Sequence, residues 1–109
     1  MSEAHAFGLT AMLTLGVGVD TRAPGGAVTV SLCGHWEHDG RCRWPHYSEI
    51  DAAAEPARLR TLVVAPVVDQ EEVVRRVKEN LASDSRWQVV SFVVDELTPE
   101  ERVHAQHIA

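Results

Sequence analysis

The chain has 109 residues and a mass of 12.0 kDa, which predicts a single domain spanning residues 1–109. Apolar residues make up 45% of the sequence and charged residues 24%, a globular composition that excludes an intrinsically disordered chain. The net charge of −6 argues against nucleic acid or an anionic membrane as the main partner. Two cysteines are too few for a disulfide framework.

The N-terminal segment contains an apolar stretch, residues 9–19, that has the hydrophobicity of a signal-peptide core. No Lys or Arg precedes Arg22, so the basic region of a signal peptide is missing. The stretch is also too short to span a bilayer. We therefore expect a soluble, cytoplasmic protein with no membrane partner.

The first half of the chain alternates in hydrophobicity over two segments. Residues 9–19 place apolar side chains at every second position, which predicts a strand with one buried face. Gly, Pro and Asp in residues 20–26 predict a turn, and residues 27–37 alternate again. These two segments are expected to pair as a hairpin. Residues 45–56 show no clear period and are expected to be irregular.

The second half of the chain predicts a strand, a helix and another strand. Residues 59–65 are dense in Leu and Val. Asp69 followed by Glu72 has the spacing of a helix capping box, and Val73, Val77 and Leu81 share one face of the helix that follows. A further strand is expected over residues 87–94, and its apolar residues on both faces predict a central position in the sheet.

A last helix is predicted from Thr98 as the cap, with Pro99 at the first helical position and Glu101 at the third. The predicted order β-β-β-α-β-α gives an α+β domain with a four-stranded mixed sheet and helices on one face. The unit over residues 59–94 is expected to be a right-handed parallel crossover. Because one sheet face would remain uncovered, we expect a homodimer that forms through that face.

An unusual cluster of cysteines and histidines lies between residues 33 and 46. Thiolate and imidazole are the ligands that Zn²⁺ prefers. The sequence therefore predicts a small zinc-binding domain, and five residues of this segment are its candidate ligands: Cys33, His35, His38, Cys42 and His46.

The turn within this segment decides which of the candidate ligands can meet. Asp39-Gly40 favours a tight hairpin, in which Cys33, His35 and His46 would share one ion. A regular hairpin would place Cys42 ~13 Å from Cys33, which excludes both a disulfide between them and a site that holds all the ligands. If the segment forms a loop instead, Cys42 and either His35 or His38 can join Cys33 and His46 in one site.

Two other functions are compatible with the same segment. A hairpin that carries Trp36 and Trp44 would suit a homodimeric protein-interaction module without catalysis. A small thiol- or metal-dependent enzyme would use Glu37 as a general base, or Cys42 as a thiolate favoured by its neighbouring arginines. The plainest interpretation is two reduced cysteines with no metal. The sequence specifies neither a reaction nor a ligand.

The final helix carries Glu100, His104 and His107 at a spacing that places them on one helical face. This pattern favours a solvated polar face, and its alternative is a set of additional metal ligands.

Overall fold

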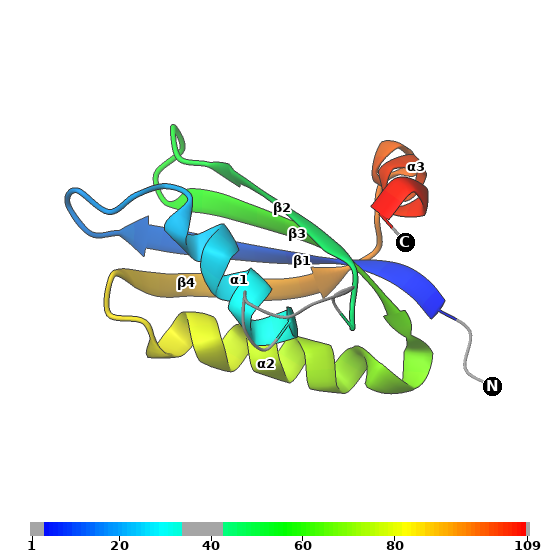
Figure 1. Ribbon diagram of the computed structural model, residues 1–109. Helices are drawn as coiled ribbons and strands as arrows, with labels where there is room; N and C mark the ends of the chain where they lie inside the picture. The colour runs from blue at the N-terminus through cyan, green and yellow to red at the C-terminus, as the bar shows by residue number, and fades with distance from the viewer. Residues whose placement is uncertain (1–3, 34–42, 109) are drawn as a thin grey trace.

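The computed structural model describes residues 4–33 and 43–108 (Figure 1). In chain order the elements are β1 (Ala4–Leu15), α1 (Ala23–Cys33), β2 (His46–Asp51), β3 (Ala57–Pro66), the short 3-10 helix η1 (Val67–Asp69), α2 (Gln70–Ser83), β4 (Trp87–Asp95) and α3 (Pro99–Ile108). The four strands form one sheet in the order β2-β3-β1-β4, and every neighbouring pair is antiparallel.

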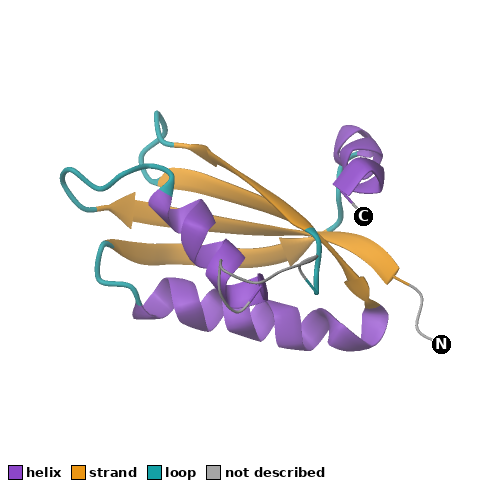
Figure 2. Cartoon of the chain, in the orientation of Figure 1, coloured by secondary structure: helices purple, strands orange, loops and turns teal. Residues whose placement is uncertain are grey.

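Helices α1 and α2 lie side by side on one face of this sheet, whereas α3 lies apart from them near the end of β4 (Figure 2). Without the short η1, the elements from β1 to β4 have the β-α-β-β-α-β order of ferredoxin-like folds, in which two split βαβ units interlock. This topology serves many unrelated functions, so a function has to be argued from a site.

The main core lies between the sheet and the helices α1 and α2. Alternate residues of β1 point into it, because successive side chains of a strand face opposite sides of a sheet. The fully buried side chains that fill it come from the sheet, from both helices and from the segment before β2: Leu9, Leu13, Val28, Leu32, Trp44, Leu59, Val63, Val73, Val77 and Leu81. A second, smaller cluster packs α3 against the opposite face through Leu62, Val64, Leu97 and Ala105.

The predicted α+β class and a four-stranded sheet are confirmed, but the sheet is antiparallel rather than mixed. Strands β3 and β4 run in the same direction and are joined through α2, as the sequence suggests. They are not neighbours, because β1 lies between them and pairs with both. The helices also occupy both faces, since α3 packs on the face opposite α1 and α2.

The predicted strand over residues 27–37 is wrong, since α1 occupies Ala23–Cys33. Pro24, Val28 and Leu32 are its buried residues, and their spacing of four fits one face of a helix as well as one face of a strand. The Thr29 hydroxyl donates to the Gly25 carbonyl oxygen at 3.2 Å, which is a contact across one helical turn. Pro24 is compatible with the start of this helix, because the N–H that proline lacks would have no partner within the helix in the first turn.

Strand β2 occupies part of the stretch that the sequence analysis expects to be irregular. Its sequence is mostly polar, yet it alternates between half-buried and exposed residues. The Ser48 and Thr61 hydroxyls share a hydrogen bond of 2.9 Å between β2 and β3. Pairing with β3, rather than its own hydrophobicity, makes this segment a strand.

The strands over β3 and β4 and the helices α2 and α3 are confirmed, with one difference in position. Strand β4 lies at an edge of the sheet and not at its centre. At the start of α3, the Thr98 N–H donates to Glu101 Oε1 at 2.9 Å and the Glu101 N–H donates to Thr98 Oγ1 at 3.1 Å, which forms the expected capping box. Among the described residues, no helix is both long and apolar enough to cross a membrane.

Candidate functional site

The predicted zinc-binding domain is wrong for the described residues. Across residues 4–33 and 43–108, no three His, Cys, Asp or Glu side chains come close enough together to hold a metal ion. Of the five candidate ligands, His35, His38 and Cys42 lie outside the described residues, so their assignment and that of a zinc ion stay untested predictions. Cys33 and His46 are described, and both are committed to other interactions.

Cys33 is the last residue of α1, and it is disulfide-bonded. A disulfide sulfur carries no thiolate, so this residue offers neither a metal ligand nor a nucleophile in that state. This removes Cys33 from the predicted site. The other cysteine of the sequence, Cys42, lies outside the described residues, as does Glu37, so the proposed thiol and general-base roles are not placed.

His46 opens β2, and both of its ring nitrogens have partners within the fold. Nδ1 lies 3.1 Å from the Trp44 carbonyl oxygen, and Nε2 lies 3.0 Å from the Thr29 hydroxyl of α1. Burial lowers the pKa of His46 below its usual 6.5 and favours the neutral ring. The histidine therefore joins β2 to α1.

Trp44 is fully buried, so the projecting aromatic arm is wrong for this residue. Its indole N–H donates to Asp69 Oδ2 at 3.1 Å, which uses the carboxylate that was expected to cap α2. The guanidinium groups of Arg43 and Arg76 lie 4.5 Å and 5.0 Å from the ring centroid. Trp36, the other tryptophan of that hypothesis, lies outside the described residues.

The polar face of α3 forms no metal site within the described part of the chain. His104 instead packs on the ring of Tyr47 in β2, with 4.3 Å between the ring centroids. Glu100 and His107 are exposed, as a solvated face predicts.

A cleft of about 770 Å³ lies at the end of the sheet where α3 begins. Its residues come from five elements, β1, β3, α2, β4 and α3, and from the turn between β4 and α3. They combine an apolar floor with a polar rim: Ala4, His5, Ala6, Phe7, Val64, Gln70, Val94, Asp95, Glu96, Arg102, Ala105 and Gln106. We refer to this cavity as the α3 cleft.

Unequal strand lengths create the α3 cleft. Strand β1 pairs with β3 from Ala4 onward, but its pairing with β4 begins only at Gly8, opposite Asp95. Residues 4–7 of β1 therefore have a strand partner on one side only, within the part of the chain that the structure describes. Alternate N–H and C=O groups of residues 4–7 point toward this free edge, where a further strand could pair.

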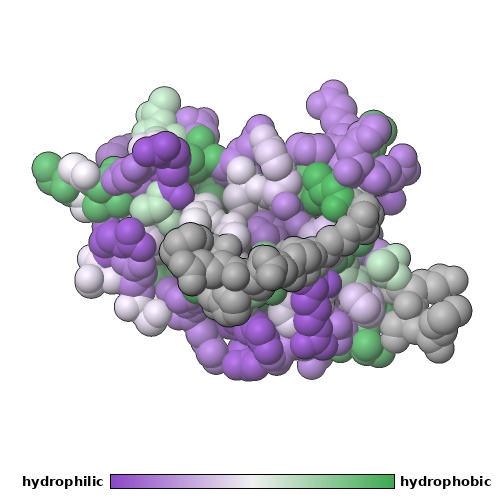
Figure 3. Space-filling view, viewed as in Figure 1, coloured by the Kyte–Doolittle hydropathy of each residue, from purple (hydrophilic) through white to green (hydrophobic). Residues whose placement is uncertain are grey.

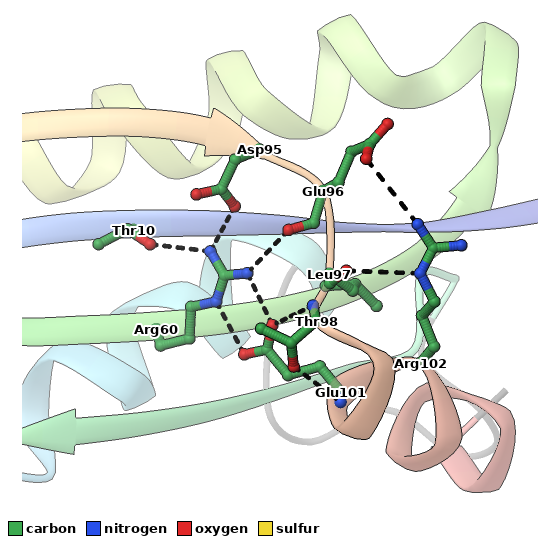
Figure 4. Close-up of polar contacts among 8 residues, drawn as sticks. All are labelled: Thr10, Arg60, Asp95, Glu96, Leu97, Thr98, Glu101 and Arg102. Carbon is green, nitrogen blue, oxygen red and sulfur yellow. Dashed lines mark hydrogen bonds and ion pairs between the residues drawn. The ribbon is translucent and has the colours of Figure 1, made fainter.

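A buried arginine holds α3 beside this edge (Figure 4). The Arg60 side chain of β3 is only 9% exposed. Its Nε and Nη2 donate to the two carboxylate oxygens of Glu101 at 3.0 Å and 2.9 Å, a bidentate pair with the first turn of α3. It also donates to Asp95 at the end of β4, to Thr10 Oγ1 at 2.8 Å and to the Glu96 carbonyl oxygen at 3.3 Å. One guanidinium thus connects three strands and the turn to α3.

Gly8 leaves the space that this guanidinium occupies. A Cβ at Gly8 would lie 2.6 Å from Arg60 Cζ and 2.7 Å from Nη1, closer than van der Waals contact allows. The arginine could move away only by giving up several of its hydrogen bonds. The network therefore requires glycine at this position of β1.

The electrostatics of the network keep the Glu101 carboxylate charged. Hydrogen bonding to Arg60 lowers the pKa of Glu101 to about 2, and the Thr98 N–H contributes in the same direction. Hydrogen bonds to Glu101 and Asp95 in turn raise the pKa of Arg60 further above its usual range. The ion pair therefore persists at neutral pH.

On the opposite wall of the cleft, His5 joins β1 to the start of α2. Its Nε2 lies 2.7 Å from Gln70 Oε1, its Nδ1 lies 3.1 Å from the Ala65 carbonyl oxygen, and its ring stacks on Phe7 at 5.2 Å. With both nitrogens bonded inside the protein, His5 forms part of a fixed wall.

The sequence analysis selects no residue of the α3 cleft. One signal was present: Arg60 interrupts the apolar run of β3, and an arginine in a buried strand requires an anionic partner. Its partners, Asp95 and Glu101, are more than 30 residues away in the sequence, so only the fold identifies them.

The sequence matches no known protein family and no curated protein. The geometry of the α3 cleft is therefore the basis for a function.

We expect Gly8→Ala to destabilise the protein by about 1–3 kcal/mol, because the new methyl group displaces the Arg60 guanidinium. In an Arg60→Met background the same substitution should cost nothing or stabilise slightly, since alanine suits a strand better than glycine. Urea unfolding of the four proteins measures this coupling. An equal cost of Gly8→Ala in both backgrounds would contradict the close approach.

The stability that Glu101 contributes should depend on pH. Because its folded pKa is about 2 and its ordinary value is 4.5, the contribution is complete above pH 4.5 and is lost as the pH falls toward 2. Glu101→Gln should lower the melting temperature at pH 6 and flatten its decline between pH 4.5 and 2. Parallel curves for the two proteins across this window would refute the assignment.

His46 should make the protein less stable in mild acid. Its folded pKa lies below 6.5, so the unfolded chain binds the proton more readily and stability falls as the pH drops below 6.5. His46→Asn can still donate to the Trp44 carbonyl oxygen, and it should reduce the change in melting temperature between pH 7 and pH 5. If the melting temperature of the variant changes between pH 7 and pH 5 as much as that of the wild type, His46 is not the source of the pH dependence.

Proposed function

We propose that the protein is a peptide-binding domain, and that its α3 cleft takes a short extended segment of a partner protein. The observation that carries this proposal is the free edge of β1 at residues 4–7, which faces the cleft. An extended peptide that adds to a sheet edge gains backbone hydrogen bonds whatever its sequence, and pockets beside the edge supply selectivity.

The lining of the cleft suits such a segment. Ala4, Ala6 and Val94 retain exposed apolar surface that side chains of a bound strand can contact. The volume of about 770 Å³ falls within the range of ordinary binding sites. Arg60 and the capping box fix α3 as one wall, so little order has to be gained on binding.

The charges of the cleft favour a basic peptide. Asp95 retains a side chain that is 47% exposed, and the Glu96 side chain is 93% exposed. Arg60 and Arg102 offset part of this negative charge, through the ion pair with Asp95 and through a 3.9 Å contact with Glu96. Together with the net charge of −6 for the chain, this predicts a partner segment that carries Lys or Arg.

Fluorescence anisotropy with a labelled hexapeptide of alternating Lys and Val tests this proposal. The peptide should bind, and replacing its lysines by glutamates should weaken binding at least tenfold. N-methylation of one set of alternate peptide nitrogens should abolish binding, whereas N-methylation of the other set should be tolerated, because only one edge of a paired strand faces β1. Equal tolerance of both sets would exclude backbone pairing.

A pair of charge reversals places the peptide in the cleft. Glu96→Lys should weaken binding of the Lys/Val peptide at least fivefold by removing a cleft carboxylate. Glu100→Lys makes the same change in charge on the exposed face of α3, outside the cleft lining, and should have less than a twofold effect. Equal losses of affinity in both variants would show that the overall charge of the protein, and not the cleft, determines binding.

A further inference from the structure

The free edge of β4 differs in composition from the edge at the other side of the sheet. Strand β2, at that other edge, has six residues and carries Glu49 and Asp51. Short length and charge are the usual protection of an edge against pairing. Strand β4 has nine residues, and Asp95 at its end is the only charged one. Its composition led the sequence analysis to place it at the centre of a sheet.

The side chains of β4 are also unusually exposed for an apolar strand. Val90 is 59% exposed, Val93 is 50% exposed and Val94 is 38% exposed, although all three belong to a regular strand. A long apolar strand with an open row of backbone N–H and C=O groups is a template for another strand. Within the described residues β4 pairs with β1 only, so its outer edge lacks a partner.

We infer that a second copy of this chain covers the edge, with β4 pairing antiparallel to β4 of the partner about a two-fold axis perpendicular to the sheet. The pairing makes one continuous eight-stranded sheet. A two-fold axis perpendicular to the sheet leaves the helices of both copies on the same face of the joined sheet. Since α2 runs along the β4 side of that face (Figure 1), the two copies of α2 come to lie next to each other in antiparallel orientation.

The charges of α2 favour this arrangement. Arg76 and Asn80 face Trp44 and α1, and at 3.6 residues per turn the opposite side of the helix, toward the sheet edge, carries Glu71, Val74 and Lys78. Within the described residues Glu71 and Lys78 form no ion pair, whereas Glu72 and Glu79 bind arginines of the same helix. An antiparallel two-fold pair sets Glu71 of each copy against the lysine of the other.

The surface shows where this contact would lie. Hydrophilic atoms follow the lower margin of the molecule in Figure 3, where Figure 1 places α2. Polar side chains on the helices beside an apolar strand edge match the polar rim and apolar centre of a protein interface. The sequence-based prediction of a homodimer through the open sheet face is thereby replaced by a proposal for the strand edge, since α3 already covers one end of that face.

Sedimentation velocity of the full chain across a concentration series tests the inference. The wild-type protein should be a dimer, and Glu71→Lys and Lys78→Glu should each weaken dimerisation at least tenfold by placing like charges together. The double variant Glu71→Lys/Lys78→Glu has the net charge of the wild type and restores opposite charges across the axis, so it should dimerise within threefold of the wild type. Circular dichroism confirms that each variant is folded.

A wild-type protein that stays monomeric at 200 µM would overturn the inference. So would single variants that dimerise as well as the wild type, or a double variant no better than the singles. Hydrogen exchange gives a second measurement: amides of residues 88–94 that are protected in the dimer should exchange faster on dilution. Protection that is independent of concentration would contradict pairing through β4.

Discussion

The arrangement of this protein around its cleft depends on one ion-pair network, in which the buried Arg60 binds Glu101, Asp95, Thr10 and the Glu96 carbonyl oxygen. A guanidinium buried on a sheet face is costly unless each donor is satisfied, and this network satisfies them with groups from β1, β4 and α3. Because Glu101 of α3 supplies two of these acceptors, the buried charge is satisfied only when α3 lies at this position. Gly8 provides the space and the Thr98–Glu101 capping box orients the carboxylate, so a few local features converge on one contact.

The position of α3 gives the unequal strand lengths a functional meaning. Without this helix, residues 4–7 of β1 would be an ordinary exposed edge, whereas with it the edge becomes one side of a walled cleft. The sheet thus offers two distinct edges for pairing. The short one at β1 faces the α3 cleft with its exposed carboxylates and suits a basic peptide. The long one at β4 is open and apolar and suits a second copy of the chain.

The sequence predicted those parts of the fold that local patterns determine, and it missed those that depend on distant partners. The capping box of α3 and the buried face of α2 follow from neighbours in the chain and are confirmed. The α1 segment was assigned to a strand because residues 27–37 alternate in hydrophobicity. The residues that the helix buries, Pro24, Val28 and Leu32, are spaced by four, which satisfies both the helical and the strand period. The cysteine–histidine cluster drew attention by its composition, yet Cys33 and His46 are held by a disulfide and by hydrogen bonds. The α3 cleft could not be predicted, because its groups meet only when β1, β4 and α3 are assembled.

Backbone pairing at residues 4–7 is the central claim, and amide hydrogen exchange measured by NMR with saturating Lys/Val hexapeptide tests it most directly. Because alternate residues of a strand direct their N–H groups to the same edge, the account predicts that the peptide slows exchange at alternate amides within residues 4–7 and leaves their neighbours, already bonded to β3, unchanged. Unchanged exchange at all of these amides, with the peptide bound, would show that the partner segment binds elsewhere and that the free edge of β1 is not the binding site.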